Sequence, residues 1–203
     1  MAKLPPRIVI TGTHGVGKST LVAALCAHYR QRGVVTEVAR EFGRRYIEYS
    51  GDPLRLTPAS TNPSRQVISL FHDVQEEFRA AAAGDLVICD RGVVDSLAYS
   101  EAVGITYDAV DLKFARGLVH EHARGYDLVI YLPVEFALAD DGVRMADVAF
   151  QKFMDEQIYK GWRDAGVSPV MVRGTEAQRL AQAVRLIDAV RGPINAPRGP
   201  QPG

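Results

Sequence analysis

The sequence predicts an α/β protein with a five-stranded parallel sheet flanked by helices. Short apolar runs rich in β-branched residues, typical of strands buried on both faces, alternate with longer segments of helical periodicity. The first strand, the first helix and the second strand fit within about thirty residues, the size of a βαβ unit. The 203 residues therefore predict a single domain over residues 1–191.

Five segments have the pattern of buried strands. Each is a short apolar run bounded by glycine, proline or polar residues. They are Arg7 to Thr11, Val34 to Val38, Leu86 to Asp90, Leu128 to Leu132 and Pro169 to Val172. Because the intervening segments are long enough for crossover helices, the strands can all run parallel.

Helical periodicity marks four segments. The first extends from Lys18 to Gln31 and is followed by Gly33, a common helix stop. The second opens at Asn62-Pro63 and closes at Gly84. Apolar residues at helical spacing define the expected buried faces of the second, third and fourth segments: Val67, Leu70, Phe71, Val74 and Phe78 in the second, Phe153, Met154, Ile158 and Trp162 in the third, and Leu180, Val184 and Ile187 in the fourth.

Composition and charge exclude several classes of function. Lys plus Arg and Asp plus Glu both total 24, so no basic field attracts nucleic acid or an anionic membrane. The sequence has neither a signal-peptide run nor a bilayer-spanning stretch, and Cys26 and Cys89 have no metal-ligand spacing. We expect a cytoplasmic protein with small-molecule ligands and reduced core cysteines. A homodimer is possible.

A glycine-rich turn joins the first strand to the first helix. It reads Gly12-x4-Gly17-Lys18-Ser19, the spacing of a P-loop, whose backbone N–H groups curl around phosphates. Lys18 adds a positive charge near the β- and γ-phosphates, and the Ser19 hydroxyl is a ligand for Mg²⁺. The pattern predicts that ATP or another triphosphate binds with Mg²⁺ at Gly12, Thr13, His14, Gly15, Val16, Gly17, Lys18, Ser19 and Thr20.

Charged residues also follow the third and second strands, where parallel sheets bind ligands. Asp90 ends the third strand like a Walker B carboxylate and is a candidate for Mg²⁺, while Arg91 could bridge phosphate oxygens. A surface Asp-Arg turn is the alternative. In the second strand, Glu37 is the candidate base and Arg40 a candidate substrate contact, although both could belong to a solvated charged stretch.

A lid is predicted at residues 137–150. Asp140-Asp141-Gly142 is a turn signal before a long helical pattern, and Arg144 beside it could close on phosphates. A plain turn with an exposed arginine is the alternative. The loop from Ser50 to Pro63 could lie beside a substrate, and the Pro- and Gly-rich tail, residues 192–203, is expected to be disordered.

These features, in this order, resemble small P-loop kinases of nucleosides and nucleotides, and most closely the ribosylnicotinamide-kinase-like ATPase group. Thymidylate kinases share the Asp-Arg pair seen at Asp90-Arg91. Deoxynucleoside kinases carry Glu-Pro-x-Ala-Arg, where this chain has Glu37-Val38-Ala39-Arg40. The resemblance spans about Arg7 to Arg191. The sequence departs from the family pattern at Val38, where the deoxynucleoside kinases have proline, and in the lid, which lacks a second closely spaced arginine.

The resemblance implies a role for several residues. Glu37 would be the base, Asp90 would bind Mg²⁺ and Arg91 would contact phosphate. Asp95 or Tyr99 would lie near the acceptor, and a loop at Gly174 and Thr175 would contact adenine.

The leading hypothesis is an ATP-dependent kinase of a small acceptor: a nucleoside, a nucleotide or nicotinamide riboside. A regulatory NTPase and a nucleotide-dependent binding module are the alternatives. The chain has no Asn-Lys-x-Asp string for guanine and no Asp-x-x-Gly switch after the third strand, which disfavours a GTPase.

Overall fold

The computed structural model describes residues 4–41, 63–102, 109–135 and 148–192. Within them, five strands form one sheet in the order β2-β3-β1-β4-β5, and all neighbouring strands are parallel. The strands are β1 (Arg7–Thr11), β2 (Thr36–Arg40), β3 (Leu86–Asp90), β4 (Leu128–Tyr131) and β5 (Val170–Met171). The predicted α/β fold with a five-stranded parallel sheet is confirmed.

The second strand begins two residues later than the apolar run Val34 to Val38 predicts. Val34 belongs to the turn that follows α1 (Lys18–Arg30), because its N–H donates to the Tyr29 carbonyl at 3.1 Å. The strand then continues through Arg40, which lies opposite Asp90 in the ladder with β3. The carboxyl end of β2 is therefore formed by Arg40 and the following Glu41.

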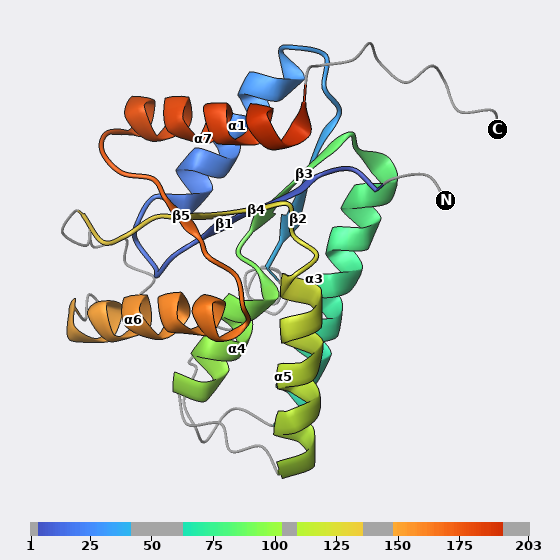
Figure 1. Ribbon diagram of the computed structural model, residues 1–203, viewed down its shortest axis with the longest axis vertical. Coiled ribbons are helices and arrows are strands. Elements are labelled where there is room, and N and C mark those ends of the chain that lie inside the picture. The colour runs from blue at the N-terminus through green and yellow to red at the C-terminus, as the bar shows by residue number, and fades with distance from the viewer. Residues whose placement is uncertain (1–3, 42–62, 103–108, 136–147, 193–203) are drawn as a thin grey trace, which may run out of the picture.

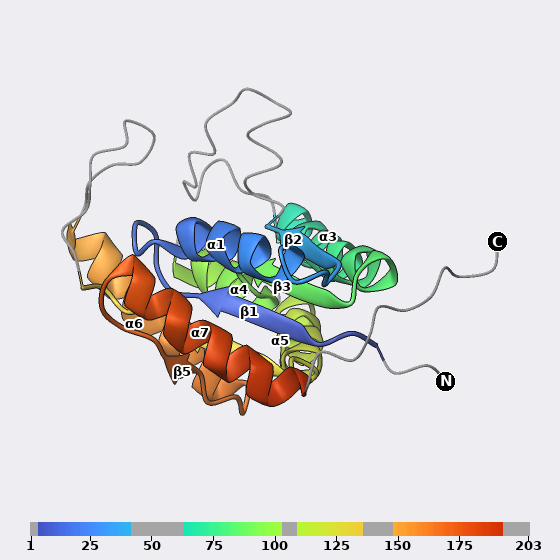
Figure 2. The same ribbon diagram turned by 90° about the horizontal axis from the view of Figure 1, so that it is seen from above.

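Helices cover both faces of the sheet (Figure 1). One face packs against α1 (Lys18–Arg30) and α7 (Glu176–Arg191), which lie side by side in Figure 2 and are joined by a 2.9 Å hydrogen bond from the Tyr29 hydroxyl to Asp188. The other face packs against α3 (Pro63–Ala83), α4 (Val93–Ala102), α5 (Ala109–Ala123) and α6 (Val148–Asp164). Successive side chains of a strand point to opposite faces of the sheet. Ile8 and Ile10 therefore pack in the first core, beneath α1 and α7, and Val9 packs in the second core, on the other face.

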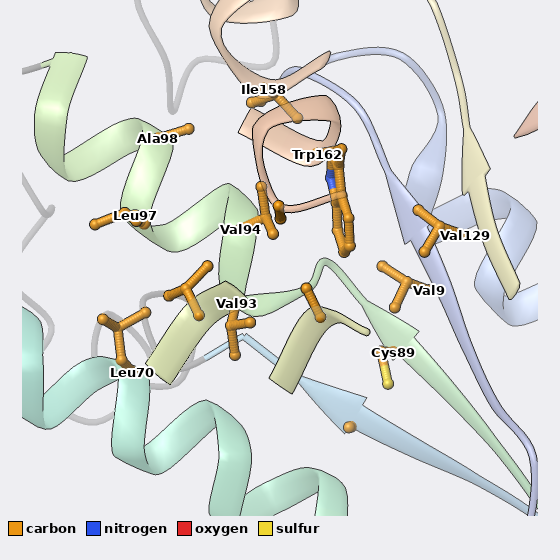
Figure 3. Close-up of a cluster of buried hydrophobic side chains, with 14 of the residues drawn as sticks. Val9, Leu70, Cys89, Val93, Val94, Leu97, Ala98, Val129, Ile158 and Trp162 are labelled. Atoms are coloured by element: carbon orange, nitrogen blue, oxygen red, sulfur yellow. The ribbon is translucent and has the colours of Figure 1, made fainter. Parts of the chain in front are cut away.

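Trp162 of α6 is the largest fully buried side chain of the second core. Figure 3 shows its ring between α4 and the strands. A side chain at Gly92 would meet this ring at 2.9 Å, so glycine lets the segment after β3 pass beneath it. The predicted core cysteines, Cys26 and Cys89, are both free and buried, and burial raises the pKa of each thiol.

The buried face of α3 differs from the predicted apolar stripe. Phe71 and Phe78 are 48% and 49% exposed, while Asp73 and Glu77 point inward and are buried. Glu77 is held there by hydrogen bonds, including one of 2.6 Å from the Tyr126 hydroxyl. Hydrogen-bonded carboxylates therefore occupy the buried face of α3, where hydrophobic periodicity predicts the aromatic rings of Phe71 and Phe78. Phe153 of α6, also predicted on a buried face, is 44% exposed.

Several predictions fall on residues outside the described ranges. They are the lid with Arg144, most of the loop from Ser50 to Pro63, and the tail beyond Gly192. These remain predictions, as does the assignment of residues 1–191 to one domain. Among the residues that the structure describes, no helix is both long enough and apolar enough to cross a bilayer.

Candidate nucleotide-binding site

The predicted P-loop lies between the carboxyl end of β1 and the start of α1. Its three glycines, Gly12, Gly15 and Gly17, have φ angles of 134°, 74° and 88°, which side chains disfavour. A Cβ atom at Gly12 would also collide with the Leu132 carbonyl oxygen of the neighbouring strand. The turn can therefore be this tight only because glycine stands at these places, as a phosphate cradle requires.

Lys18 is buried at the base of this loop, and its ammonium group donates to the Thr13 carbonyl. Burial lowers its pKa well below the usual value, and the nearby Arg91 guanidinium lowers it further, against the opposing effect of Asp95 and Asp90. A bound anion next to the buried ammonium group would stabilise its charged form. The electrostatics of the loop thus favour a bound phosphate.

The two predicted magnesium ligands lie next to each other. The Ser19 hydroxyl, in the first turn of α1, donates to Asp90 Oδ2 at 3.1 Å. A hydroxyl and a carboxylate are the hard oxygen donors that Mg²⁺ accepts, so the pair fits the ion. The described ranges contain no group of three or more His, Cys, Asp or Glu side chains able to hold a metal. Water and phosphate oxygens would complete the coordination.

Arg91 is buried directly after β3 and has a φ of 82°, a left-handed conformation unusual for a side-chain-bearing residue. Its Nε lies 2.9 Å from Glu41 Oε2, its Nη1 donates to the Gly12 carbonyl at 3.3 Å, and its guanidinium covers the Tyr99 ring. Burial alone would lower the pKa of Arg91, but Glu41, Tyr99 and Asp95 raise it above its ordinary value. The arginine therefore keeps its charge beside the P-loop.

Glu37, the predicted base, does not lie at this site. It is the second residue of β2 and pairs with Val87 near the amino end of β3. Its side chain lies against Gly84, where an added Cβ would approach Glu37 Cγ to 3.0 Å. In a parallel sheet this is the edge opposite the P-loop. Because β2 begins at Thr36, the carboxylate after its carboxyl end is Glu41.

Asp95 lies beneath the site rather than facing a substrate. It is fully buried in α4 and accepts hydrogen bonds of 2.7 and 2.8 Å from the Thr11 hydroxyl and one of 3.3 Å from the Gly92 N–H. Burial raises its pKa, against the opposing effect of Arg91. Asp95 thereby holds the turn that carries Arg91, and its contact with an acceptor stays a prediction.

Tyr99 lies nearer the P-loop, and its hydroxyl is 3.3 Å from His14 Nδ1. Arg40 is exposed at the end of β2 and lines a small cavity between the strand ends and helices α3 and α4. Within the same cavity the Ser96 hydroxyl donates to Asp73 at 2.7 Å. The complete lining is Ala39, Arg40, Glu41, Asp73, Glu77, Arg91, Gly92 and Ser96.

The segment after β5 has a clear local role. Thr175 caps α7 by accepting from the Gln178 N–H, and Gln178 in turn accepts from the Thr175 N–H. The Gly174 N–H donates to Glu135 at 2.9 Å. The contact of Gly174 and Thr175 with adenine stays a prediction.

Three contributors to the site had not been predicted. Gln151 Nε2 donates to the His14 carbonyl at 2.9 Å, and Arg179 Nη1 donates to the Val16 carbonyl at 2.6 Å. Glu135 pairs with Arg179 at 2.7 Å. Glu135 follows β4 and could have been suspected from its strand-end position, whereas Gln151 and Arg179 lie inside amphipathic helices with no local signal.

A glycine-rich phosphate loop after the first strand of a parallel sheet defines the chain as a P-loop protein. Residues 7–179 match the family described as an AAA domain, and the chain belongs to that family. Its resemblance to thymidylate kinases also extends over most of its length. It is 28% identical over 193 residues to the thymidylate kinase of Psychrobacter sp. (strain PRwf-1), covering 88% of this chain and 86% of that protein.

The thymidylate kinase of Rhizorhabdus wittichii is 30% identical over 204 residues, covering 90% of this chain and 95% of that protein. Among solved structures, NadR protein in complex with NR superimposes with a TM-score of 0.68 at 16% identity, covering 96% of this chain. The chain spans about half the length of NadR, 54%. The NadR likeness concerns the fold. Together, these findings confirm the recognition of a small P-loop protein related to nucleoside and nucleotide kinases.

Proposed function

We propose that the protein transfers the γ-phosphoryl group of ATP to a small acceptor, a nucleoside, a nucleotide or nicotinamide riboside. One observation carries the proposal: the Ser19–Asp90 pair and the Arg91–Glu41 pair both lie close to Lys18, at the P-loop edge of the sheet. The first pair suits a magnesium-bound triphosphate, and the second suits an acceptor and the group being transferred. The thymidylate kinase relatives support the same reaction class.

The donor half of the site would work by positioning and charge. The N–H groups of residues 13–19 would bind the β- and γ-phosphates, and Lys18 would neutralise charge on the γ-phosphate. Ser19 and Asp90 would hold Mg²⁺, which supplies further charge neutralisation and orients the phosphates. Phosphoryl transfer needs little covalent chemistry from the protein beyond this arrangement.

The acceptor half would use Glu41 and Arg91. If the acceptor presents a hydroxyl, its proton moves to the Glu41 carboxylate as its oxygen bonds to the γ-phosphorus and the bond to ADP breaks. The Arg91 guanidinium would follow the charge on the transferred group, since it remains protonated in its buried position. The hydrogen-bonded Asp73–Ser96 pair lines the small cavity next to Arg91, beside the place proposed for the acceptor.

The proposal is tested by incubating the protein with ATP, Mg²⁺ and a pool of nucleosides, nucleotides and nicotinamide riboside, followed by mass-resolved detection of products. A Lys18→Met variant, purified identically, controls for contaminating kinases. We expect one class of acceptor to gain a phosphoryl group with the wild-type protein only. Hydrolysis of ATP without any phosphorylated acceptor would instead favour a regulatory NTPase.

A further inference from the structure

We infer that Gln151 and Arg179 are positioning residues of the nucleotide site, each turning one peptide of the P-loop so that its N–H faces the phosphates. The inference extends the nucleotide-binding part of the proposed function to two residues outside the P-loop motif. Gln151 belongs to α6 and Arg179 to α7. They reach the loop across 137 and 163 residues of sequence.

Both side chains are buried, and both donate to carbonyl oxygens of the loop. Gln151 is 1% exposed, and its amide donates to the His14 carbonyl at 2.9 Å. Arg179 is 5% exposed, and its Nη1 donates to the Val16 carbonyl at 2.6 Å. A Cβ atom at Gly17 would lie 3.4 Å from the same nitrogen, so the guanidinium packs directly on the loop backbone.

The planarity of the peptide bond converts these contacts into a direction for the N–H groups. The described residues contain no cis peptide, and in a trans peptide the C=O and the following N–H point in opposite directions. Holding the His14 carbonyl toward α6 therefore turns the Gly15 N–H away from α6. Holding the Val16 carbonyl toward α7 turns the Gly17 N–H away from α7. These two N–H groups belong to the glycines that form the phosphate cradle.

Two further carbonyls of the loop are held by residues that belong to the predicted site. Arg91 donates to the Gly12 carbonyl and Lys18 to the Thr13 carbonyl. Gln151 and Arg179 extend this pattern to the glycine-rich half of the loop. A glycine backbone has the greatest conformational freedom, so external hydrogen bonds have the most to fix there. Pre-orienting the donors reduces the ordering cost of phosphate binding.

Arg179 is itself held in place by a carboxylate. Its Nη2 lies 2.7 Å from Glu135 Oε2, and the same oxygen accepts the Gly174 N–H at 2.9 Å. A buried guanidinium is tolerated only when it is paired and hydrogen-bonded, and Glu135 supplies that pairing. Glu135 thereby connects the P-loop to the segment between β5 and α7.

The experiment measures dissociation constants for ATP and for inorganic tripolyphosphate, which reports on the phosphate cradle without the nucleoside. Gln151→Met keeps the side-chain volume but removes the donor, and it should weaken both ligands by about three- to tenfold. Arg179→Met loses a charged donor and should weaken both by about tenfold or more. Arg179→Lys, which can still donate to Val16, should recover part of the affinity.

Matched controls come from the same helices. Gln157→Met on α6 and Arg185→Met on α7 change the same residue types away from the loop, and both should bind ATP like the wild-type protein. Thermal unfolding of the ligand-free variants separates a fold defect from a binding defect. If Arg179→Met does not fold, Gln151→Met and Arg179→Lys carry the test.

The inference fails if Gln151→Met, and Arg179→Met where that variant folds, bind ATP and tripolyphosphate within twofold of the wild-type protein, whatever happens to their melting temperatures. It also fails if tripolyphosphate affinity is unchanged while ATP affinity falls, because the effect would then lie at the nucleoside. A wild-type protein that binds neither ligand would instead overturn the proposed nucleotide site itself. If the wild-type protein binds ATP but phosphorylates no acceptor, the proposed transfer reaction fails, but the binding test of Gln151 and Arg179 still applies.

Discussion

Asp90, the last residue of β3, accepts a hydrogen bond from the Ser19 hydroxyl in the first turn of α1, at 3.1 Å. The two residues are 71 positions apart in sequence. The parallel sheet places the carboxyl end of β3, the strand paired directly with β1, next to the P-loop. The contact joins one hydroxyl and one carboxylate, the oxygen ligands that Mg²⁺ prefers. Two oxygen atoms at this separation can serve a common ion, which gives the magnesium proposal a direct test.

Asp90→Asn should weaken Mg²⁺-dependent ATP binding, because the ion loses a formal negative charge from its surroundings. We expect the Mg²⁺ concentration for half-maximal ATP binding to rise by about tenfold, with little change in the weak binding measured in EDTA. Isothermal titration with and without Mg²⁺ makes the comparison. Asp164→Asn, at an exposed site on α6, is the matched control. An unchanged Mg²⁺ profile in Asp90→Asn would exclude Asp90 from the metal site.

Lys18→Met should separate function from stability. The substitution removes the cation that would meet the γ-phosphate, so ATP affinity and phosphoryl transfer should be lost. It also removes a buried charge whose pKa is lowered by burial, so the ligand-free variant should melt at or above the temperature of the wild-type protein. Melting curves with and without MgATP measure both effects. A ligand-free variant several degrees less stable than the wild type would show that Lys18 supports the fold.

The lowered pKa of Lys18 also predicts how the stability of the ligand-free protein depends on pH. The folded protein releases this proton at a lower pH than the unfolded chain, whose lysine has the ordinary value of 10.5. In that window the unfolded chain binds more protons, so the Lys18 contribution to stability rises with pH from the folded pKa toward 10.5. Urea unfolding of both proteins across alkaline pH isolates this contribution: the stability of the wild type relative to Lys18→Met should rise with pH. Parallel pH profiles would contradict it.

The contrast between Glu37 and Glu41 shows how far the sequence could predict this molecule. The strands, their parallel orientation and the P-loop followed from hydrophobic runs, the lengths of the connecting segments and one motif, all of which can be read locally. The bounds of β2 did not, because the turn after α1, closed by the hydrogen bond from the Val34 N–H to the Tyr29 carbonyl, delays the strand by two residues. That shift moved the candidate carboxylate from one end of the strand to the other.

The buried polar contacts were beyond local patterns for a related reason. Asp73 and Glu77 look like solvent-facing residues on α3 until Tyr126 and Ser96 are placed beside them. Gln151 and Arg179 gain their roles only through folding, which brings α6 and α7 to the loop. Hydrophobic periodicity indicates which face of a helix is apolar. It does not indicate which polar side chains will form hydrogen bonds in the protein interior.

Trp162→Phe should test the hydrogen-bond chain beneath the site. The indole N–H donates to the Thr11 hydroxyl at 3.0 Å, and that hydroxyl donates to Asp95. Removing the donor and part of the ring should lower the free energy of unfolding by about 1–3 kcal/mol. Phe153→Leu, at a 44% exposed position on the same helix, should change it by less than about 0.5 kcal/mol. Equal effects of the two substitutions in urea unfolding would contradict this account.

Glu41→Gln addresses the chemistry of transfer. The amide keeps the shape of the carboxylate and can still accept a hydrogen bond from Arg91, but it cannot take a proton from an acceptor hydroxyl. Turnover should therefore fall by about a hundredfold or more, with ATP affinity nearly unchanged. Steady-state transfer rates and an ATP titration measure the two quantities on the same preparation.

Glu37→Gln is the matched control, because it makes the same change in the same strand at the opposite edge of the sheet. It should leave turnover within a few-fold of the wild type. A hundredfold loss in Glu37→Gln with normal turnover in Glu41→Gln would reverse the assignment of the base. If the acceptor already carries a phosphate, no base is needed, and both glutamine variants should transfer at near-normal rates. In that case Arg91→Met should still be severely impaired, because the charge on the transferred group would lose its buried guanidinium partner.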